Sequence, residues 1–456
     1  MCEAGDPGAH SVGPDTDRSG RTPRLIIPDE LLSYARFIAD EPEIRRTAAG
    51  FIGYGATKPG DRVLLAADTH FDPLVVEAMS RALREKGASV DVVVVQAEPD
   101  REFEDADELR AAIRRRPWAQ EPRRWEGVPW VEELALKRGY DLLVHGKGGG
   151  IPNTPHRYEA FPWLQQDQFA SAATTYPREL HLLINRRAWE PFYAKAPGGR
   201  VRVTDPEGTD VTWDMWPEYF ERPSPMFGPV PRWNHLMSHP PTPLSPRESA
   251  TGIVKGTTNH FGRPYPPIAV HVDQGKVERV DGGGAYGELW RELMDEAKDI
   301  QYPSFPRKGL FWMWEAAIGT NPKIRRPRNI RFLSSGGFEW ERRRSGIVHL
   351  GFGTQWRGPE EKWAGDAGLV YGHLHVHLMF ATMTLTAADG SEVRLLDQGR
   401  LVALDDPDVR AMAARLGDPD ALLAVDWTPK LPSVSAPGEY ARYALDPAAY
   451  IYRDDA

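Results

Sequence analysis

The chain has 456 residues, enough for two or three domains of ordinary size, and we expect two. Hydrophobic residues make up 41% and charged residues 27%, as in a globular protein, and a formal net charge of -9 leaves no basic surplus for binding nucleic acid. Because there is neither a long apolar run nor a secretory signal pattern, we expect a cytoplasmic protein that does not enter a membrane.

The first half of the chain alternates helical and extended patterns. Residues 1–23 are rich in Gly, Pro, Asp and Ser and predict a disordered tail. A helical pattern over 28–48 is followed by apolar strands at 59–67 and 90–95, with a helix predicted over 73–87 between the strands. Strand, helix, strand with nearly continuous apolar strands is typical of a parallel sheet.

The same pattern continues beyond an insertion. Residues 98–128 are charged and rich in Arg and Trp, which predicts a solvated surface segment. A helix at 131–137 leads to another strand at 140–145. The glycines of 146–150 lack the Gly-Lys-Ser/Thr ending of a phosphate loop, so no phosphate site is expected there. The apolar run 179–185 is predicted to be a further strand.

The pattern changes near residue 200, and we place a domain boundary there. Two alternating runs on either side of Pro-Glu-Gly predict a hairpin over 200–213, and a second hairpin is predicted over 267–280. The predicted fold class is therefore α/β, with a parallel-sheet α/β domain over 24–199 followed by a β-rich α+β domain over 200–456 that binds the metal discussed below.

Three histidines alternate with apolar residues in the run 371–380, which predicts a strand. His373, His375 and His377 would share one face, with neighbours roughly 6.6 Å apart and the outer pair roughly 13 Å apart. Two of the three are thus expected to share a metal ion, the alternative being imidazoles bonded to backbone or water. With Cys2 as the single cysteine, a metal must be bound by His, Asp or Glu.

Two more polar residues stand in apolar surroundings. His349 lies in Gly346-Ile-Val-His-Leu-Gly-Phe-Gly353, and a buried imidazole needs a hydrogen bond or a metal. Glu315 lies in an apolar run that starts at Trp312, and a buried carboxylate must be paired, protonated or bound to a cation. The alternative for Glu315 is an ion pair with a nearby arginine such as Arg325.

These segments resemble the aminopeptidase T-like metallopeptidases, a superfamily that also includes the iron-dependent 2,5-dihydroxypyridine dioxygenases. The resemblance runs over residues 30–390 and is carried by Pro-Gly-Asp-Arg-Val, by Glu315-Ala-Ala-Ile-Gly-Thr-Asn-Pro322, by the block around His349 and by the His-x-His strand. It implies an α/β domain, a metal-binding second domain and pairing of subunits into homodimers.

Position by position, the resemblance assigns several metal ligands. Glu315 and His349 match a metal-binding Glu and a metal-binding His of the family. His375 matches the His of the family's His-x-Asp pair, and His377 stands where that pair has its Asp.

The resemblance also points to two residues farther from these blocks. His239 is the nearest match to an upstream metal-binding Glu, and Glu341 to an acid that serves the reaction near His349. Carboxylates offset the charge of two metal ions held about 3.5 to 4 Å apart, and His239 and His377 would replace two of them. One metal ion is therefore expected, with Fe(II) favoured and Zn or another divalent ion as the alternative.

The leading hypothesis is a mononuclear non-haem iron dioxygenase that cleaves or oxidises a small aromatic or heteroaromatic substrate. His349, His375 and His377 would bind iron, and Glu315 would be a fourth ligand or a nearby acid. The residues expected to line the substrate pocket are Trp312, Trp314, Trp356 and His373.

Two alternatives remain open. In a metal-dependent aminopeptidase-like hydrolase, zinc or another divalent ion would activate water, with Glu315 or Glu341 as the base. In a non-catalytic descendant of the same scaffold, the protein would only bind a ligand.

Overall fold

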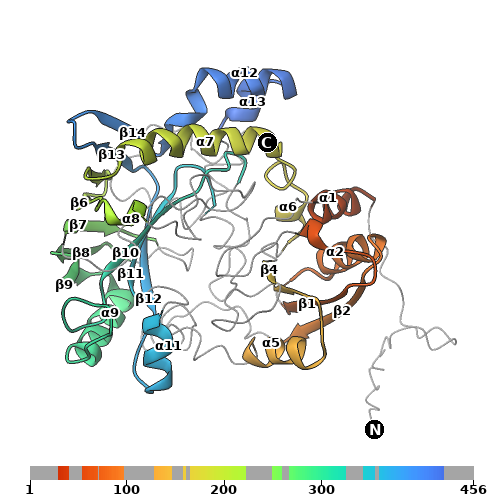
Figure 1. The fold of residues 1–456 in the computed structure, drawn as a ribbon, viewed down its shortest axis with the longest axis horizontal. Helices are drawn as coiled ribbons and strands as arrows, with labels where there is room; N and C mark the ends of the chain where they lie inside the picture. The colour runs from red at the N-terminus through yellow and green to blue at the C-terminus, as the bar shows by residue number, and fades with distance from the viewer. Residues whose placement is uncertain are drawn as a thin grey trace, which may run out of the picture.

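The structure is a computed structural model, and it describes residues 29–40, 54–69, 71–96, 128–145, 158–160, 165–221, 249–258, 266–324, 343–354 and 359–425. Figure 1 shows a small sheet with its helices on one side of the molecule and a larger, strand-rich part on the other. The predicted tail at 1–23 and the glycine segment at 146–150 lie outside the described residues, as does nearly all of the predicted insertion.

The N-terminal part is built on a sheet whose described strands are all parallel, in the order β2-β1-β3-β4. Its strands are β1 (Arg62–Asp68), β2 (Ser89–Val95), β3 (Leu142–His145) and β4 (Tyr158–Ala160). Its helices are α1 (Asp29–Ala39), α2 (Pro73–Glu85), α5 (Val128–Lys137) and α6 (Gln166–Phe169), and a 3-10 turn, η1 (Tyr54–Ala56), precedes β1. This confirms the predicted parallel-sheet α/β part.

Strand β1 is buried on both faces because apolar residues follow one another along it. Leu65 belongs to the cluster formed with α1 and α2, whereas Leu64 packs with Val131 of α5. Helix α2 starts where Asp72 accepts a hydrogen bond from the amide of Leu74, a side-chain cap of a helix N-terminus.

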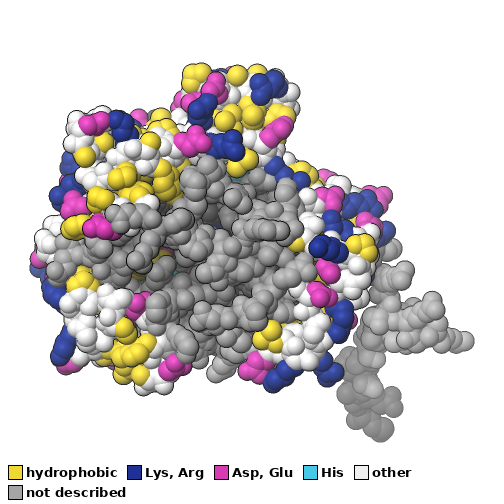
Figure 2. Space-filling view, in the orientation of Figure 1, with side chains coloured by type: hydrophobic (Ala, Val, Ile, Leu, Met, Phe, Trp, Pro, Cys, Tyr) yellow, Lys and Arg dark blue, Asp and Glu magenta, His cyan; other side chains and the backbone are white. Residues whose placement is uncertain are grey.

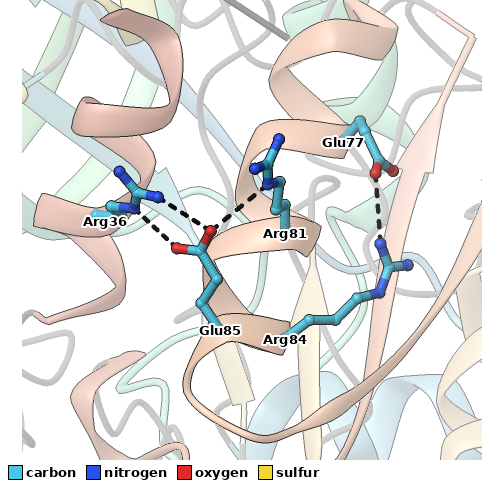
Figure 3. Close-up of polar contacts among 5 residues, drawn as sticks. All are labelled: Arg36, Glu77, Arg81, Arg84 and Glu85. Atoms are coloured by element: carbon cyan, nitrogen blue, oxygen red, sulfur yellow. Dashed lines mark hydrogen bonds and ion pairs between the residues drawn. The ribbon is translucent and has the colours of Figure 1, made fainter. Parts of the chain in front are cut away.

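Helices α1 and α2 are also joined by surface ion pairs (Figure 3). Arg36 of α1 lies 2.8 Å from Glu85 of α2, and Arg81 reaches the same carboxylate at 3.5 Å. Arg84 pairs with Glu77, about two turns away on the same helix. All of these side chains are substantially exposed, so the ion pairs contribute little to stability, and the buried apolar residues of α1 and α2 hold the two helices together.

The larger part contains a sheet of eight described strands in the order β15-β14-β13-β5-β6-β7-β8-β9. These strands are β5 (Arg200–Thr204), β6 (Asp210–Asp214), β7 (Thr251–Gly256), β8 (Ile268–Asp273), β9 (Lys276–Gly282), β13 (Thr382–Thr386), β14 (Glu392–Asp397) and β15 (Arg400–Leu401). All neighbours pair antiparallel, and the two predicted hairpins are confirmed as β5–β6 and β8–β9. The predicted β-rich second part is therefore also confirmed.

A second antiparallel sheet, with described strand order β10-β11-β12, lies between this sheet and the N-terminal part (Figure 1). Its strands are β10 (Met313–Ile318), β11 (Val348–Gly353) and β12 (His373–Leu378). The remaining elements are α7 (Arg178–Lys195), α8 (Glu218–Glu221), α9 (Gly284–Ala297), α11 (Pro359–Asp366), η2 (Val402–Asp405), α12 (Pro407–Leu416) and α13 (Pro419–Leu423).

The predicted strand at 179–185 is wrong, because these residues begin the long helix α7. Buried Leu180, Ile184 and Ala188 recur every four positions, which is a helical period, and seven residues are too short a window to reveal it. The helix packs in the larger core, where Phe192 also lies. The domain boundary near residue 200 stays a prediction.

The segment after β10 connects the two cores. The side-chain amide of Asn321 donates to the carbonyl of Ala173 at 3.0 Å, and Ile324 is buried in the cluster beneath α1 and α2. Thr320 hydrogen-bonds to His181 of α7 at 2.8 Å. The residues that directly follow strand β10, which carries Glu315, therefore pack against the N-terminal part.

The described surface carries charges of both signs. Figure 2 shows basic and acidic side chains interspersed around the described rim of this face. Among the described helices, each is too short or too polar to cross a membrane.

Candidate metal centre

The three-stranded sheet brings polar residues of three separate segments into register. Glu315 of β10 lies opposite Gly351 of β11, which in turn lies opposite His375 of β12. In the next row, His349 lies opposite His377. Directly opposed residues point to the same face of a sheet, so all of these side chains share one face.

The other face of the same sheet is apolar. Leu350, Phe352 and Val376 alternate with the polar residues and are buried in the main hydrophobic core. Both faces are covered, since every residue of β10, β11 and β12 is buried. The predicted strand with its histidines on one face is confirmed, and the polar face is enclosed as well.

Gly351 makes the closest contact in this row possible. Strands lie about 4.8 Å apart, so the backbones of β10 and β12 are separated by about 10 Å. A Cβ atom on Gly351 would lie 2.9 Å from both Glu315 Oε2 and His375 Nε2. The missing side chain leaves the space in which the two functional groups meet.

The Glu315 carboxylate contacts two imidazoles, one with each oxygen. Oε1 lies 3.0 Å from His349 Nε2, and Oε2 lies 2.9 Å from His375 Nε2. Burial by itself would raise the pKa of Glu315, but the two neighbouring imidazoles favour the charged carboxylate and hold its pKa well below the usual range. The site therefore offers an ionised carboxylate between two imidazoles.

Glu315, His349 and His375, called the ligand group below, could together hold a metal ion. Among the described residues, one ligand atom from each of Glu315, His349 and His375 lies within 4.8 Å of the others, and all three residues are buried. Imidazole and carboxylate are ordinary ligands of zinc and of non-haem iron. The chemistry of the donors and their convergence thus fit one divalent cation.

The other two histidines of β12 flank this group. The ring of His377 lies 5.6 Å from that of His349, but within the described part of the chain His377 is not a member of the ligand group. The ring of His373 lies 4.8 Å from that of His375. Burial, together with repulsion from His375, lowers the pKa of His373 to about 3, so this imidazole is neutral at pH 7.

The predicted pocket residues have different surroundings. Trp314 packs edge-on against His373, with ring centroids 5.1 Å apart, and so lies beside the ligand group. Trp312 is fully buried against Phe305, with the guanidinium of Arg307 over its ring. The other predicted site residues, which lie outside the described residues, are His239, Glu341 and Trp356.

The structure adds two contacts that sequence reasoning missed. The hydroxyl of Tyr286 in α9 donates to the carbonyl oxygen of His375 and accepts from its amide. The amide of His377 donates to the carbonyl of Thr258, just beyond β7. Tyr286 lies in the first turn of α9, just after a run of glycines, and nothing in that sequence pattern points to the histidine strand.

No protein-family model matches this sequence, and no curated protein sequence matches it. Among solved structures, one similar fold is 2,5-dihydroxypyridine dioxygenase from Pseudomonas putida KT2440, with 13% identity and a TM-score of 0.43 over 82% of this chain and 97% of that chain. Another is AmpT from Thermus thermophilus, with 14% identity and a TM-score of 0.43 over 82% of this chain and 99% of that chain.

Proposed function

We propose that this protein is a metal-dependent enzyme in which Glu315, His349 and His375 bind one divalent ion. The observation that supports this most directly is the position of the Glu315 carboxylate, 3.0 Å and 2.9 Å from the Nε2 atoms of histidines on two other strands. Two imidazoles and one carboxylate occupy part of the coordination sphere and leave positions open for a substrate.

In this proposal the ion is Fe(II) and the protein is a dioxygenase acting on a small aromatic or heteroaromatic molecule. Two histidines and one carboxylate form the donor set typical of non-haem iron oxygenases, and the group has a single carboxylate. The resemblance to the dihydroxypyridine dioxygenases adds to this preference. When bound, iron supplies the O₂ chemistry that amino-acid side chains lack.

The residues around the ligands have separate tasks. A neutral His373 can exchange a hydrogen bond with a substrate hydroxyl without adding charge beside the metal ligands. Trp314, edge-on to His373, supplies an apolar wall against which a flat ring can pack. The burial of all these groups keeps bulk water away from the reacting centre.

The alternative is a zinc-dependent hydrolase that uses the same three ligands, since zinc also accepts imidazole and carboxylate. That reaction needs a general base besides the ligands. Glu315 is a poor base because its pKa is held low, so Glu341 would have to serve.

Metal analysis of protein purified without oxygen tests the proposal. One iron per chain, with O₂ uptake on addition of aromatic diols or aminophenols, is the expected result. His375→Ala should lose the metal, and the control His271→Ala should keep it, because His271 is bonded to Asp281 on the surface of the other sheet. Bound zinc with release of amino acids from aminoacyl substrates would favour the hydrolase instead. Absence of metal in the wild-type protein would overturn both functions.

A further inference from the structure

Among the described strands, β12 forms one edge of its sheet. On the side of β12 away from β11, Tyr286 contacts the backbone of His375, a proposed metal ligand. The hydroxyl of Tyr286 donates to the carbonyl oxygen of His375 at 2.8 Å. The same hydroxyl oxygen accepts from the amide of His375 at 3.1 Å. One side chain thus makes both hydrogen bonds that a neighbouring strand would make to this residue.

A run of glycines brings Tyr286 to this edge. Gly282, Gly283 and Gly284 all have positive φ, at 67°, 78° and 53°, which side chains other than glycine rarely adopt. A Cβ atom on Gly287 would lie 1.9 Å from the carbonyl oxygen of Gly282. The first turn of α9 therefore starts in a tight bend that only glycine permits.

Close packing around the ring fixes the position of the Tyr286 hydroxyl. Tyr286 is 3% exposed and packs edge-on against Trp290, with ring centroids 6.1 Å apart. Farther along β12, the amide of His377 is bound by the carbonyl of Thr258 at 2.9 Å. Hydrogen bonds from outside the sheet thus hold the backbone of β12 at His375 and at His377, and His375 is a proposed metal ligand.

We propose that Tyr286 is a positioning residue of the metal centre. By binding both backbone groups of His375, it fixes the height and rotation of the strand at that residue, and hence the place of its imidazole opposite Glu315. Groups that hydrogen-bond a ligating side chain commonly change metal affinity about 10- to 100-fold when they are removed, and we expect a similar range for a group that holds the backbone of a ligand. This inference rests on the metal site proposed above.

The test compares two tyrosine variants. Tyr286→Phe removes the hydroxyl and keeps the ring. Tyr302→Phe is the matched control, since Tyr302 is equally buried and its hydroxyl donates to the carbonyl of Val370, ahead of β12. The readouts are the dissociation constant of the metal by chelator competition, the visible spectrum of the Co(II)-substituted protein, and the thermal midpoint of the metal-free protein.

We expect Tyr286→Phe to weaken metal binding about 10- to 100-fold and to change the Co(II) spectrum, while Tyr302→Phe leaves both as in the wild type. Both variants should lower the thermal midpoint of the metal-free protein, since each leaves a buried backbone group without its hydroxyl partner. Equal metal affinity for Tyr286→Phe and the wild type would overturn the inference. Absence of metal binding in the wild type would instead overturn the proposed function.

A second measurement covers the case in which Tyr286→Phe does not fold. Amide hydrogen exchange at His375 in the metal-free wild-type protein reports directly on the hydrogen bond to Tyr286. Exchange as slow as that of Val376 would support a ligand strand that is fixed before metal binds. Rapid exchange at His375 beside a protected Val376 would overturn the inference.

Discussion

Glu315 and His375 meet across a strand that separates them: their side chains are 2.9 Å apart, although β11 lies between β10 and β12. Gly351 is the residue beneath the contact. The geometry of the site therefore depends on the absence of a side chain as much as on the ligands themselves.

Gly351→Ala is expected to separate these groups. Its Cβ would lie 2.9 Å from both Glu315 Oε2 and His375 Nε2, so one of them must move. Metal affinity should fall at least about tenfold, and overpacking should cost about 1 to 3 kcal/mol in the free energy of unfolding. Metal titration and urea denaturation measure the two effects. Gly365→Ala is the control, because its Cβ would make only an ordinary contact with Tyr371, at 3.6 Å. Metal binding that is unchanged in Gly351→Ala as well as in the control would contradict the prediction.

Substitutions at the histidines should separate ligands from neighbours. Glu315→Gln and His349→Ala should abolish metal binding, because each removes one of three donors. His373→Ala should keep one metal per chain and raise KM, since His373 lies beside the ligands and is neutral. Metal content and steady-state kinetics check these outcomes. Loss of metal in His373→Ala would show that the ligand set is wrong.

A substitution at His377 distinguishes a ligand set that includes this histidine from one made of Glu315, His349 and His375 alone. The ring of His377 lies near that of His349, but the described ligand group does not include it. His377→Ala should therefore retain metal, with an affinity lowered less than in His349→Ala. Chelator competition on both variants gives the comparison, and complete loss of metal in His377→Ala would return this histidine to the ligand set.

Stability should fall as the pH rises through the titration of Glu207. Burial, with a contribution from Asp205, raises the pKa of Glu207 from 4.5 to about 8, although Thr257 donates a hydrogen bond to the carboxylate. The folded state then binds a proton more tightly than the unfolded state. The associated stability is fully present below pH 4.5 and is lost between that value and about pH 8, a change on the order of 4 kcal/mol.

Glu207→Gln should remove most of this dependence, because the amide keeps the acceptor for Thr257 and cannot ionise. Urea denaturation of the metal-free proteins at about pH 5 and about pH 8 provides the measurement. Equal slopes of stability against pH in the variant and the wild type would contradict the assignment.

Local periodicity made part of the site predictable. Alternation over residues 373–378 correctly indicated a strand with its histidines on one face, and the apolar surroundings of His349 and Glu315 correctly indicated burial. Register between strands could not be read in this way. Which histidines face Glu315 depends on how β10 and β12 align with β11, and no short-range pattern encodes that alignment.

Other features depended on long-range packing. The contact between Tyr286 and His375 joins residues 89 positions apart, so a helix pattern around Tyr286 says nothing of it. In α7 the error had a local cause, since a short apolar window around Ile184 fits a strand as well as a helix.

If the proposed metal site is occupied, the row of Glu315, Gly351 and His375 would also couple metal supply to folding. Glu315 and His375 are 60 residues apart in sequence, so bringing them together in the unfolded chain costs conformational entropy, and an ion held by both would bind the native state preferentially. Free metal at 100 times its dissociation constant would then add about 2.7 kcal/mol to the free energy of unfolding. The amount of folded protein in a cell would accordingly depend on how much metal the cell provides.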